Sequence, residues 1–177
     1  LERMYAEELI EPWTQSLVQL GSRIIAHRNT FVQEFRAYVK RAHDQLVHNG
    51  ETPDIEYSTV DGVNEHSIVQ DVIVLMRDEL GVKMYEERRR GTTLVGPHRD
   101  DLKFSINGIS VQHYASQGQH KTMLVALKTA EFFYLKERRN EVPIFLLDDA
   151  FSELDERRSR LLLNTVASLG QTFITTT

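Results

Sequence analysis

Two adjacent carboxylates, Asp148 and Asp149, directly follow the four apolar residues 144–147. Such an apolar run is typical of a strand that is buried on both faces of a parallel sheet. Ligands of open α/β sheets gather at the carboxyl ends of the strands, where two acids are costly unless a cation compensates them. Mg²⁺ carried by nucleotide phosphates would do so, with Asp148 holding the metal and Asp149 orienting or deprotonating a water. Alternatively, both acids cap the turn and helix that follow.

A second group of candidate residues precedes a long amphipathic stretch and consists of Ser116, Gln117, Gly118 and Gln119. A serine at a helix start caps the helix, a glycine lets a ligand approach the backbone, and the first N–H groups of the helix point outward. Together they could bind an anion. The helix dipole contributes only about 0.3–2 kcal/mol, so it cannot hold a nucleotide alone. A plain helix cap is the alternative.

A third group follows the two acids after only two residues: Ser152, Glu153, Leu154 and Asp155. The structural alternative is again a helix cap, with Asp155 directly before a helix that begins near Glu156. A cap and a functional role are compatible here, because the same side chain can start a helix and face a partner.

The elements that position these residues follow from the periodicity of residues 92–177. Apolar residues alternate over 102–106 and 109–111, and the intervening Asn107-Gly108 predicts a tight hairpin. A helix is expected from Ser116, a strand at 144–147, a helix over 156–169 and a β-branched strand over 172–176. Strand, helix and strand with short joints predict a parallel βαβ unit.

Residues 1–91 have helical periodicity. A helix of about 33 residues is expected between Pro12, near its start, and Asn49-Gly50, with a break near Gly21 or residues 27–29. Residues 55–60 favour a strand. A second helix would start at a cap on Asn64 and end at Gly81, and a third helical piece would run from residue 82 to 90.

Composition narrows the functional class. The 177 residues are 41% apolar and 27% charged and contain no Cys, which excludes disulfides, thiol nucleophiles and zinc ribbons and suits a reducing cytosol. Neither a leader peptide nor a bilayer-spanning run is expected, so a cytoplasmic protein without a membrane partner is predicted. The formal net charge is −5. Contact with phosphate backbones is therefore left to local clusters at 88–90 and 136–139, whose alternative role is a solvated helix face.

Taken together and in this order, the motifs resemble the C-terminal lobe of an ABC-type ATPase of the chromosome-maintenance kind. Residues 96–102, Gly-Pro-His-Arg-Asp-Asp-Leu, narrow the resemblance to the RecF family of DNA replication and repair. The resemblance rests on several motifs in residues 92–177 and on helical character in 1–91. It implies an α+β fold in which 92–177 form the lobe, with a parallel βαβ sheet and a hairpin, and 1–91 form a mainly helical subdomain, the family's second domain.

The resemblance also implies roles for individual residues. Ser116, Gln117, Gly118 and Gln119 match the signature motif, which contacts the γ-phosphate of ATP bound by the other subunit. Asp148 matches the Walker B acid that supports Mg²⁺ through water, and Asp149 stands where most relatives have a Glu general base. Ser152, Glu153, Leu154 and Asp155 match the D-loop at the dimer interface. Implied partners are ATP with Mg²⁺, a second copy, gapped or junction DNA, and a RecR-like mediator that helps load recombinase.

The sequence departs from the family pattern at several points. Gln117 replaces the commoner Gly, Thr177 stands where many ABC enzymes have a switch His, and Asp149 is shorter than Glu, which fits slow turnover. No Gly-Lys dipeptide occurs, so the phosphate-cradling loop is missing. The family carries that loop in its N-terminal lobe, and the chain, which starts at Leu1, is expected to be a fragment. Alone, it should neither bind ATP tightly nor hydrolyse it.

Other functions remain open. A non-catalytic interaction module could keep this fold without nucleotide switching. The presence of Ser116, Gly118 and Asp148 argues against it, because such a module need not retain them. Another chromosome-maintenance ATPase, such as a Rad50-like protein, would be expected to carry a long coiled coil. A plain DNA-binding domain is disfavoured by the net charge. The His residues show no spacing typical of a metal site.

Overall fold

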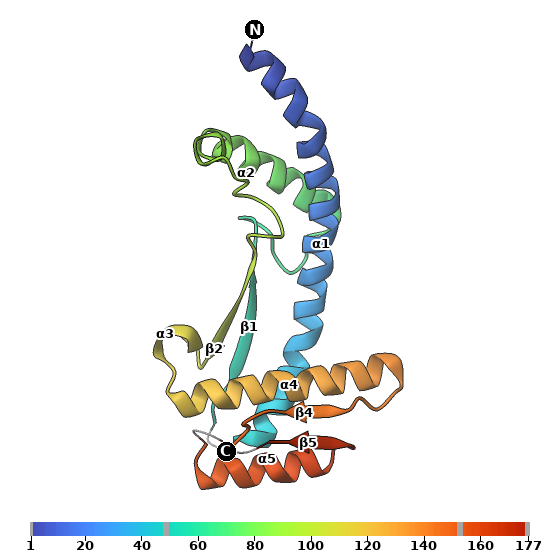
Figure 1. Ribbon diagram of the computed structural model, residues 1–177, viewed down its shortest axis with the longest axis vertical. Helices are drawn as coiled ribbons and strands as arrows, with labels where there is room; N and C mark the ends of the chain where they lie inside the picture. Colours follow the sequence, from blue (N-terminus) through green and yellow to red (C-terminus); the bar gives the residue numbers. More distant parts are fainter. Residues whose placement is uncertain (1, 48–49, 152–153, 176–177) are drawn as a thin grey trace. The chain divides into compact units, whose positions relative to one another are not determined.

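The structure is a computed structural model that describes residues 2–47, 50–151 and 154–175, with side chains from residue 9 onward (Figure 1). It is mainly helical with small sheets, which confirms the predicted α+β class. None of its described helices combines the length and the apolar character needed to cross a membrane. In chain order the elements are α1 (Glu2–Leu46), β1 (Pro53–Ser58), α2 (Val69–Arg90), β2 (Asp101–Ile106), β3 (Ile109–Ser110), α3 (Val111–Tyr114), α4 (Gln117–Arg139), β4 (Phe145–Leu147), α5 (Glu156–Ala167) and β5 (Thr172–Ile174).

Contacts within the chain divide it into two compact units. The first unit comprises residues 1–33 and 57–102, and the second comprises residues 34–56 and 103–177. Helix α1 and strands β1 and β2 contribute residues to both units. The division into domains 1–91 and 92–177 stays a prediction, since it concerns the family's domains rather than contact clusters.

The core of the first unit forms where α1 and α2 bury their apolar faces. Gly21 makes a close approach possible, because a Cβ at this position would lie 3.0 Å from Cε of Met76 and 3.1 Å from Cδ of Pro97. The predicted break near Gly21 or residues 27–29 is wrong, because α1 continues through both places without interruption. Pro12 also lies inside the helix rather than near its start. The buried cluster consists of Val18, Ile25, Val60, Val72, Met76, Leu80 and Val95.

Helix α2 also runs further than predicted. Gly81 does not end it; the helix continues to Arg90 and ends at Gly91, whose φ of 64° is left-handed. The predicted second and third helical pieces are thus one helix. Its start differs as well, because Oδ2 of Asp71 accepts a hydrogen bond from N–H of Ile68 at 2.9 Å, whereas Asn64 lies in the preceding turn.

In the second unit the predicted hairpin is confirmed. Strands β2 and β3 pair antiparallel, and Asn107 and Gly108 take the positive φ values of 52° and 76° that a type I′ turn requires. The Asn107 side chain accepts a hydrogen bond from N–H of Thr52 at 2.8 Å, which ties the turn to the segment before β1. Val111, expected at the end of the strand, instead begins the short helix α3.

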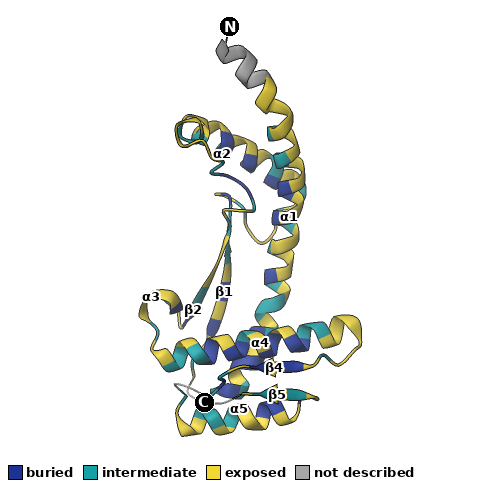
Figure 2. Cartoon of the chain, viewed as in Figure 1, coloured by how far each residue is buried: buried dark blue, intermediate teal, exposed yellow. Residues whose placement is uncertain are grey.

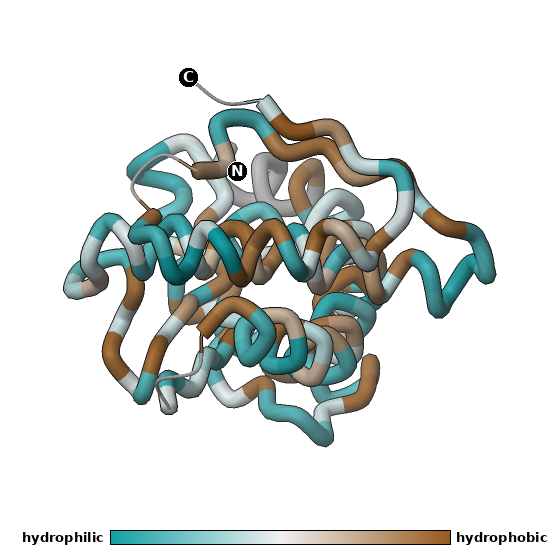
Figure 3. Tube along the Cα trace, turned by 90° about the horizontal axis from the view of Figure 1, so that it is seen from below, coloured by the Kyte–Doolittle hydropathy of each residue, from teal (hydrophilic) through white to brown (hydrophobic). Residues whose placement is uncertain are grey.

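The predicted βαβ unit is also confirmed, since β4 and β5 pair parallel with Leu146 opposite Phe173. Its burial differs from the prediction. Ile144, Leu146 and Phe173 are 60%, 68% and 55% exposed, so β4 is buried on one face only within this chain. Figure 3 shows the apolar residues of these strands side by side near the C-terminus.

The buried face of β4 packs against α4, where the rings of Phe145 and Phe132 lie 5.8 Å apart. Helix α4 has buried residues on one face between Thr122 and Phe133, with exposed residues between them (Figure 2). Its other contacts include the guanidinium of Arg41 in α1, 4.3 Å above the Phe133 ring. These contacts fix α4, the helix that carries the second group of candidate residues.

Candidate functional site

The residues Ser116, Gln117, Gly118 and Gln119 form the first turn of α4. Oγ of Ser116 accepts a hydrogen bond from N–H of Gln119 at 3.2 Å, and the Gln119 side chain accepts one from N–H of Ser116 at 3.0 Å. This reciprocal pair is a capping box, which satisfies two of the otherwise unpaired N–H groups at a helix start. The predicted helix cap is confirmed, and Ser116 and Gln117 lie toward the surface.

The side chain of Gln119 is fully engaged within the chain. Besides its bond to Ser116, its Nε2 donates to Oε1 of Glu51, in the segment before β1, at 3.0 Å. The backbone N–H of Gln119 is engaged as well, by Oγ of Ser116, so any contact of Gln119 with a phosphate would require one of these bonds to break. Ser116, at the very start of the turn, is the residue better placed to meet a ligand.

The two acids lie where the sequence predicts them, at the carboxyl end of β4. Oγ1 of Thr175, just after β5, donates a hydrogen bond to Oδ1 of Asp148 and accepts one from N–H of Asp149 at 2.9 Å. The backbone N–H of Thr175 donates to the carbonyl of Leu147 at 2.9 Å. The carboxyl ends of both parallel strands thus meet at the acidic pair, and this is the edge of such sheets at which ligands bind.

Asp149 has a left-handed backbone, with φ of 48°. This conformation is uncommon for residues with a Cβ, although Asp tolerates it better than most. Lys121 of α4 holds it by donating from Nζ to the carbonyl of Asp149 at 2.6 Å. One helix therefore carries both the capped first turn and the cation that contacts the acidic pair. The role of Asp149 as a general base stays a prediction.

The donor set suits Mg²⁺ held mainly by phosphates. Asp148 is exposed and offers a carboxylate oriented by Thr175. The described residues contain no group of three or more His, Asp or Glu side chains placed to hold a metal by themselves. Mg²⁺ in nucleotide sites typically uses one or two carboxylates, substrate phosphates and waters, so a single oriented carboxylate fits it.

The third candidate group is described only in part. Ser152 and Glu153 lie outside the described residues, as does Thr177. Asp155 caps α5 by accepting from N–H of Arg158 at 2.8 Å, as expected for a helix start. Leu154 precedes it. The assignment of these residues to a dimer interface stays a prediction.

Residues 96–101, part of the block that narrows the resemblance, have a structural role in the first unit. The Asp100 side chain, only 4% exposed, accepts hydrogen bonds from the hydroxyls of Tyr57 and of Thr59 and pairs with Arg28 at 3.4 Å. Burial, and then the bond to Asp100, raise the pKa of Tyr57. Arg28 also donates to the carbonyl of Pro97 at 2.6 Å. The block therefore fastens α1, β1 and the turn before β2 together.

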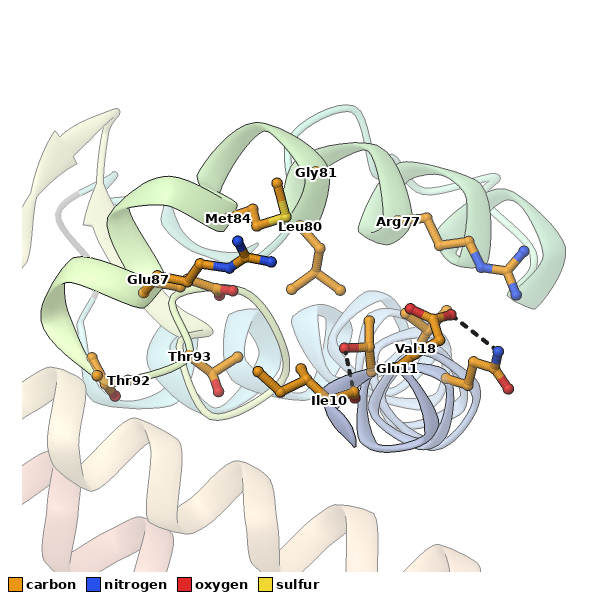
Figure 4. A pocket seen from close by; sticks show the side chains of 14 residues that line it. Ile10, Glu11, Val18, Arg77, Leu80, Gly81, Met84, Glu87, Thr92 and Thr93 are labelled. Carbon is orange, nitrogen blue, oxygen red and sulfur yellow. Dashed lines mark hydrogen bonds between the residues drawn. The ribbon is translucent and has the colours of Figure 1, made fainter. Parts of the chain in front are cut away.

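A large pocket of about 820 Å³ lies between α1 and α2 (Figure 4). Ile10 and Val18 line it from α1, and Leu80 and Met84 line it from α2, with charged Arg77, Glu11 and Glu87 around them. None of the residues predicted to meet a nucleotide lines this pocket. Its size therefore does not mark it as the predicted nucleotide site, for which the motifs and hydrogen bonds above are the evidence.

Three residues of the site escaped the sequence analysis. Thr175 could have been found, because it directly follows the strand that pairs parallel with the one before Asp148. Lys121 lies in the second turn of α4 and resembles any solvated helix lysine. Glu51 gave no signal, since its partner Gln119 is 68 positions away.

Comparison with known proteins gives one consistent result. A protein of Chloroherpeton thalassium, named DNA replication and repair protein RecF, is 45% identical over 99% of this chain and 48% of its own length. The protein of the same name from Salinibacter ruber is 42% identical over 97% of this chain and 42% of its own length. The chain thus spans about half the length of the curated relatives it matches. No family model matches.

Solved structures agree. A structure described as the recombination mediator protein RecF-ATP in the RecFOR pathway has a TM-score of 0.82 at 30% identity, over 97% of this chain and 45% of the other. A second one, described as RecF-ATPrS, has a TM-score of 0.81 at 30% identity, over 97% of this chain and 46% of the other. Sequence and fold therefore point to the same group of proteins.

Proposed function

Because this chain belongs to the RecF family and corresponds to the C-terminal portion of its members, we propose that it supplies half of an ATP site shared between two copies of a longer protein. Ser116 and the turn it caps would meet the γ-phosphate of ATP bound by the second copy. Asp148 would support Mg²⁺ through water, and Asp149 would position or deprotonate the attacking water. ATP binding would thereby join two copies.

The proposal rests above all on one observation. Helix α4 begins with the capped turn at Ser116, and one turn later its Lys121 bonds to the backbone of Asp149. Thr175 fixes the adjacent Asp148 from the other strand. A turn with outward-facing N-terminal groups and an oriented acidic pair are thus built on one continuous piece of structure. Preorganised groups of this kind are what phosphate chemistry needs.

The relatives' names support a wider role in recombination and repair. We propose that the full-length protein acts in the cytoplasm, binds DNA at gaps or junctions in its ATP-bound dimeric form, and helps a RecR-like mediator load recombinase. Hydrolysis would be slow and stimulated by DNA. The net charge of −5 assigns DNA contact to local basic clusters or to parts outside this chain.

The test is sedimentation of the full-length protein with and without ATP and Mg²⁺. The wild type should form a dimer with ATP, and Ser116→Arg should remain a monomer, because a large cation then blocks the first turn of α4. Ser16→Arg is the matched control, since Ser16 is exposed on α1 and should leave dimerisation unchanged. If the wild type ignores ATP, the proposal fails and a non-catalytic interaction role replaces it.

A further inference from the structure

We infer that Glu51 is a positioning residue for the turn that begins α4, an inference that rests on the proposed ATP site. Glu51 lies between α1 and β1, and its side chain is only 12% exposed. Its Oε1 accepts a hydrogen bond from Nε2 of Gln119 at 3.0 Å. This hydrogen bond joins two residues that lie 68 positions apart in the sequence.

The bond between Glu51 and Gln119 is important because the amide oxygen of Gln119 binds Ser116. The Gln119 Oε1 accepts from N–H of Ser116 at 3.0 Å, so the amide spans from Glu51 to the residue that starts the turn. With Nε2 held by Glu51, the amide cannot flip and must present its oxygen to Ser116. Glu51 therefore selects the orientation of Gln119 that completes the capping box.

The second carboxylate oxygen of Glu51 lies near a buried histidine, His43. His43 of α1 is fully buried, its Nε2 lies 3.8 Å from Oε2 of Glu51, and neither ring nitrogen has a hydrogen-bond partner among the described residues. Burial lowers the pKa of His43; Glu51 and Asp44 oppose the shift, while Arg158 and Lys40 add to it. The ring is therefore neutral near pH 7, and the interaction of Glu51 with Gln119 is not replaced by an ion pair with His43.

Hydrogen bonds through Glu51 and Gln119 connect the segment that follows α1 with the proposed site. Glu51 follows α1 by five residues and precedes β1, and two successive hydrogen bonds lead from it to Ser116. Positioning by such outer groups is commonly worth about 10- to 100-fold in affinity or activity. Loss of the Glu51 bond should weaken the use of ATP by the turn and leave the fold intact.

The experiment compares two conservative changes in the full-length protein. Glu51→Gln removes the charge but keeps an oxygen at the right distance from Gln119. Glu51→Asp keeps the charge but shortens the side chain by one methylene, so it no longer reaches. We expect Glu51→Asp to need about tenfold more ATP for half-maximal dimerisation, and Glu51→Gln to stay within about threefold of wild type.

Controls separate the possible outcomes. Glu56→Asp, a change at a carboxylate that is 64% exposed, should behave as wild type. Thermal unfolding of each variant shows whether the fold is kept. If Glu51→Asp behaves as wild type, or if Glu51→Gln is the weaker variant, the inference is overturned, because reach to Gln119 would not be what matters. If the wild-type protein itself does not dimerise with ATP, the proposed function fails instead.

Discussion

Thr175 shows how much one hydroxyl can organise at the residue scale. It donates to the carboxylate of Asp148 and accepts from the backbone of Asp149, so it orders both acids at once. A carboxylate held on one oxygen presents the other in a fixed direction, which is useful for a metal-bound water.

Replacing Thr175 tests this role. Thr175→Val has nearly the same shape but removes both hydrogen bonds, so under the proposed function ATP hydrolysis by the full-length protein should fall about 10- to 100-fold. Thr175→Ser should restore most of the rate because it keeps the hydroxyl. The measurement is steady-state hydrolysis as a function of Mg²⁺ concentration. Thr172→Val, in strand β5 just before Thr175, is the control, and equal rates for Thr175→Val and wild type would contradict the assignment.

Local signals explain which residues could be found from the sequence alone. Ser116 starts a helix and Asp148 ends an apolar strand, and both signals lie within a few positions of the residue itself. Glu51 and Lys121 act on partners that only the fold brings near. Long-range contacts of this kind leave no pattern in a single sequence, because neither residue differs locally from an ordinary exposed charge.

At the scale of elements, the helices of the first unit show where periodicity misleads. Gly21 and Gly81 both suggested interruptions, yet α1 and α2 pass through them. At Gly21 tight packing against Met76 explains the glycine. At Gly81 the helix continues because a glycine costs only about 1 kcal/mol in a helix interior, which neighbouring turns can offset.

Gly81 inside α2 and Gly91, which directly follows the helix, should respond oppositely to alanine. At Gly81 a Cβ would meet nothing within 4 Å, so Gly81→Ala should stabilise the protein by about 0.5–1 kcal/mol. Gly91 has a φ of 64°, so Gly91→Ala should destabilise it by about 1 kcal/mol. Urea unfolding of both variants measures the difference. A loss of stability in Gly81→Ala would contradict the open space around a Cβ at this position.

The parallel β4–α5–β5 unit was predictable because its signals agree with one another. An apolar run, a capped helix and a β-branched strand with short joints leave few topologies open. What the sequence did not reveal is that the outer face of β4 stays exposed within this chain. The chain spans about half the length of the curated relatives it matches, so burial of this face in a longer protein stays a prediction.

At the scale of the whole molecule, the free energy of folding should depend on pH through His43. Its pKa is lowered in the folded state by burial, while the unfolded chain has the ordinary value of about 6.5. The unfolded state therefore binds more protons, so the stabilising contribution is complete above about pH 6.5 and is lost as the pH falls.

A leucine at this position should remove that dependence. His43→Leu keeps the site filled, leaves no buried ring nitrogen without a partner, and should be neutral or stabilising at pH 7. Between about pH 7 and about pH 5.5 its melting temperature should fall less than that of the wild type. His113→Leu, at an exposed histidine, should keep the wild-type slope. Parallel slopes for His43→Leu and wild type would exclude His43 as the source.

The exposed face of the β4–β5 pair has a consequence for handling the isolated chain. Leu146 and Phe173 lie opposite each other in register and are both more than half exposed, next to exposed Ile144. A contiguous apolar surface beside short strand edges favours nonspecific association between molecules. We therefore expect concentrated samples of the isolated chain to aggregate and to bind dyes that fluoresce on apolar surfaces. The isolated chain should remain dispersed best in dilute solution.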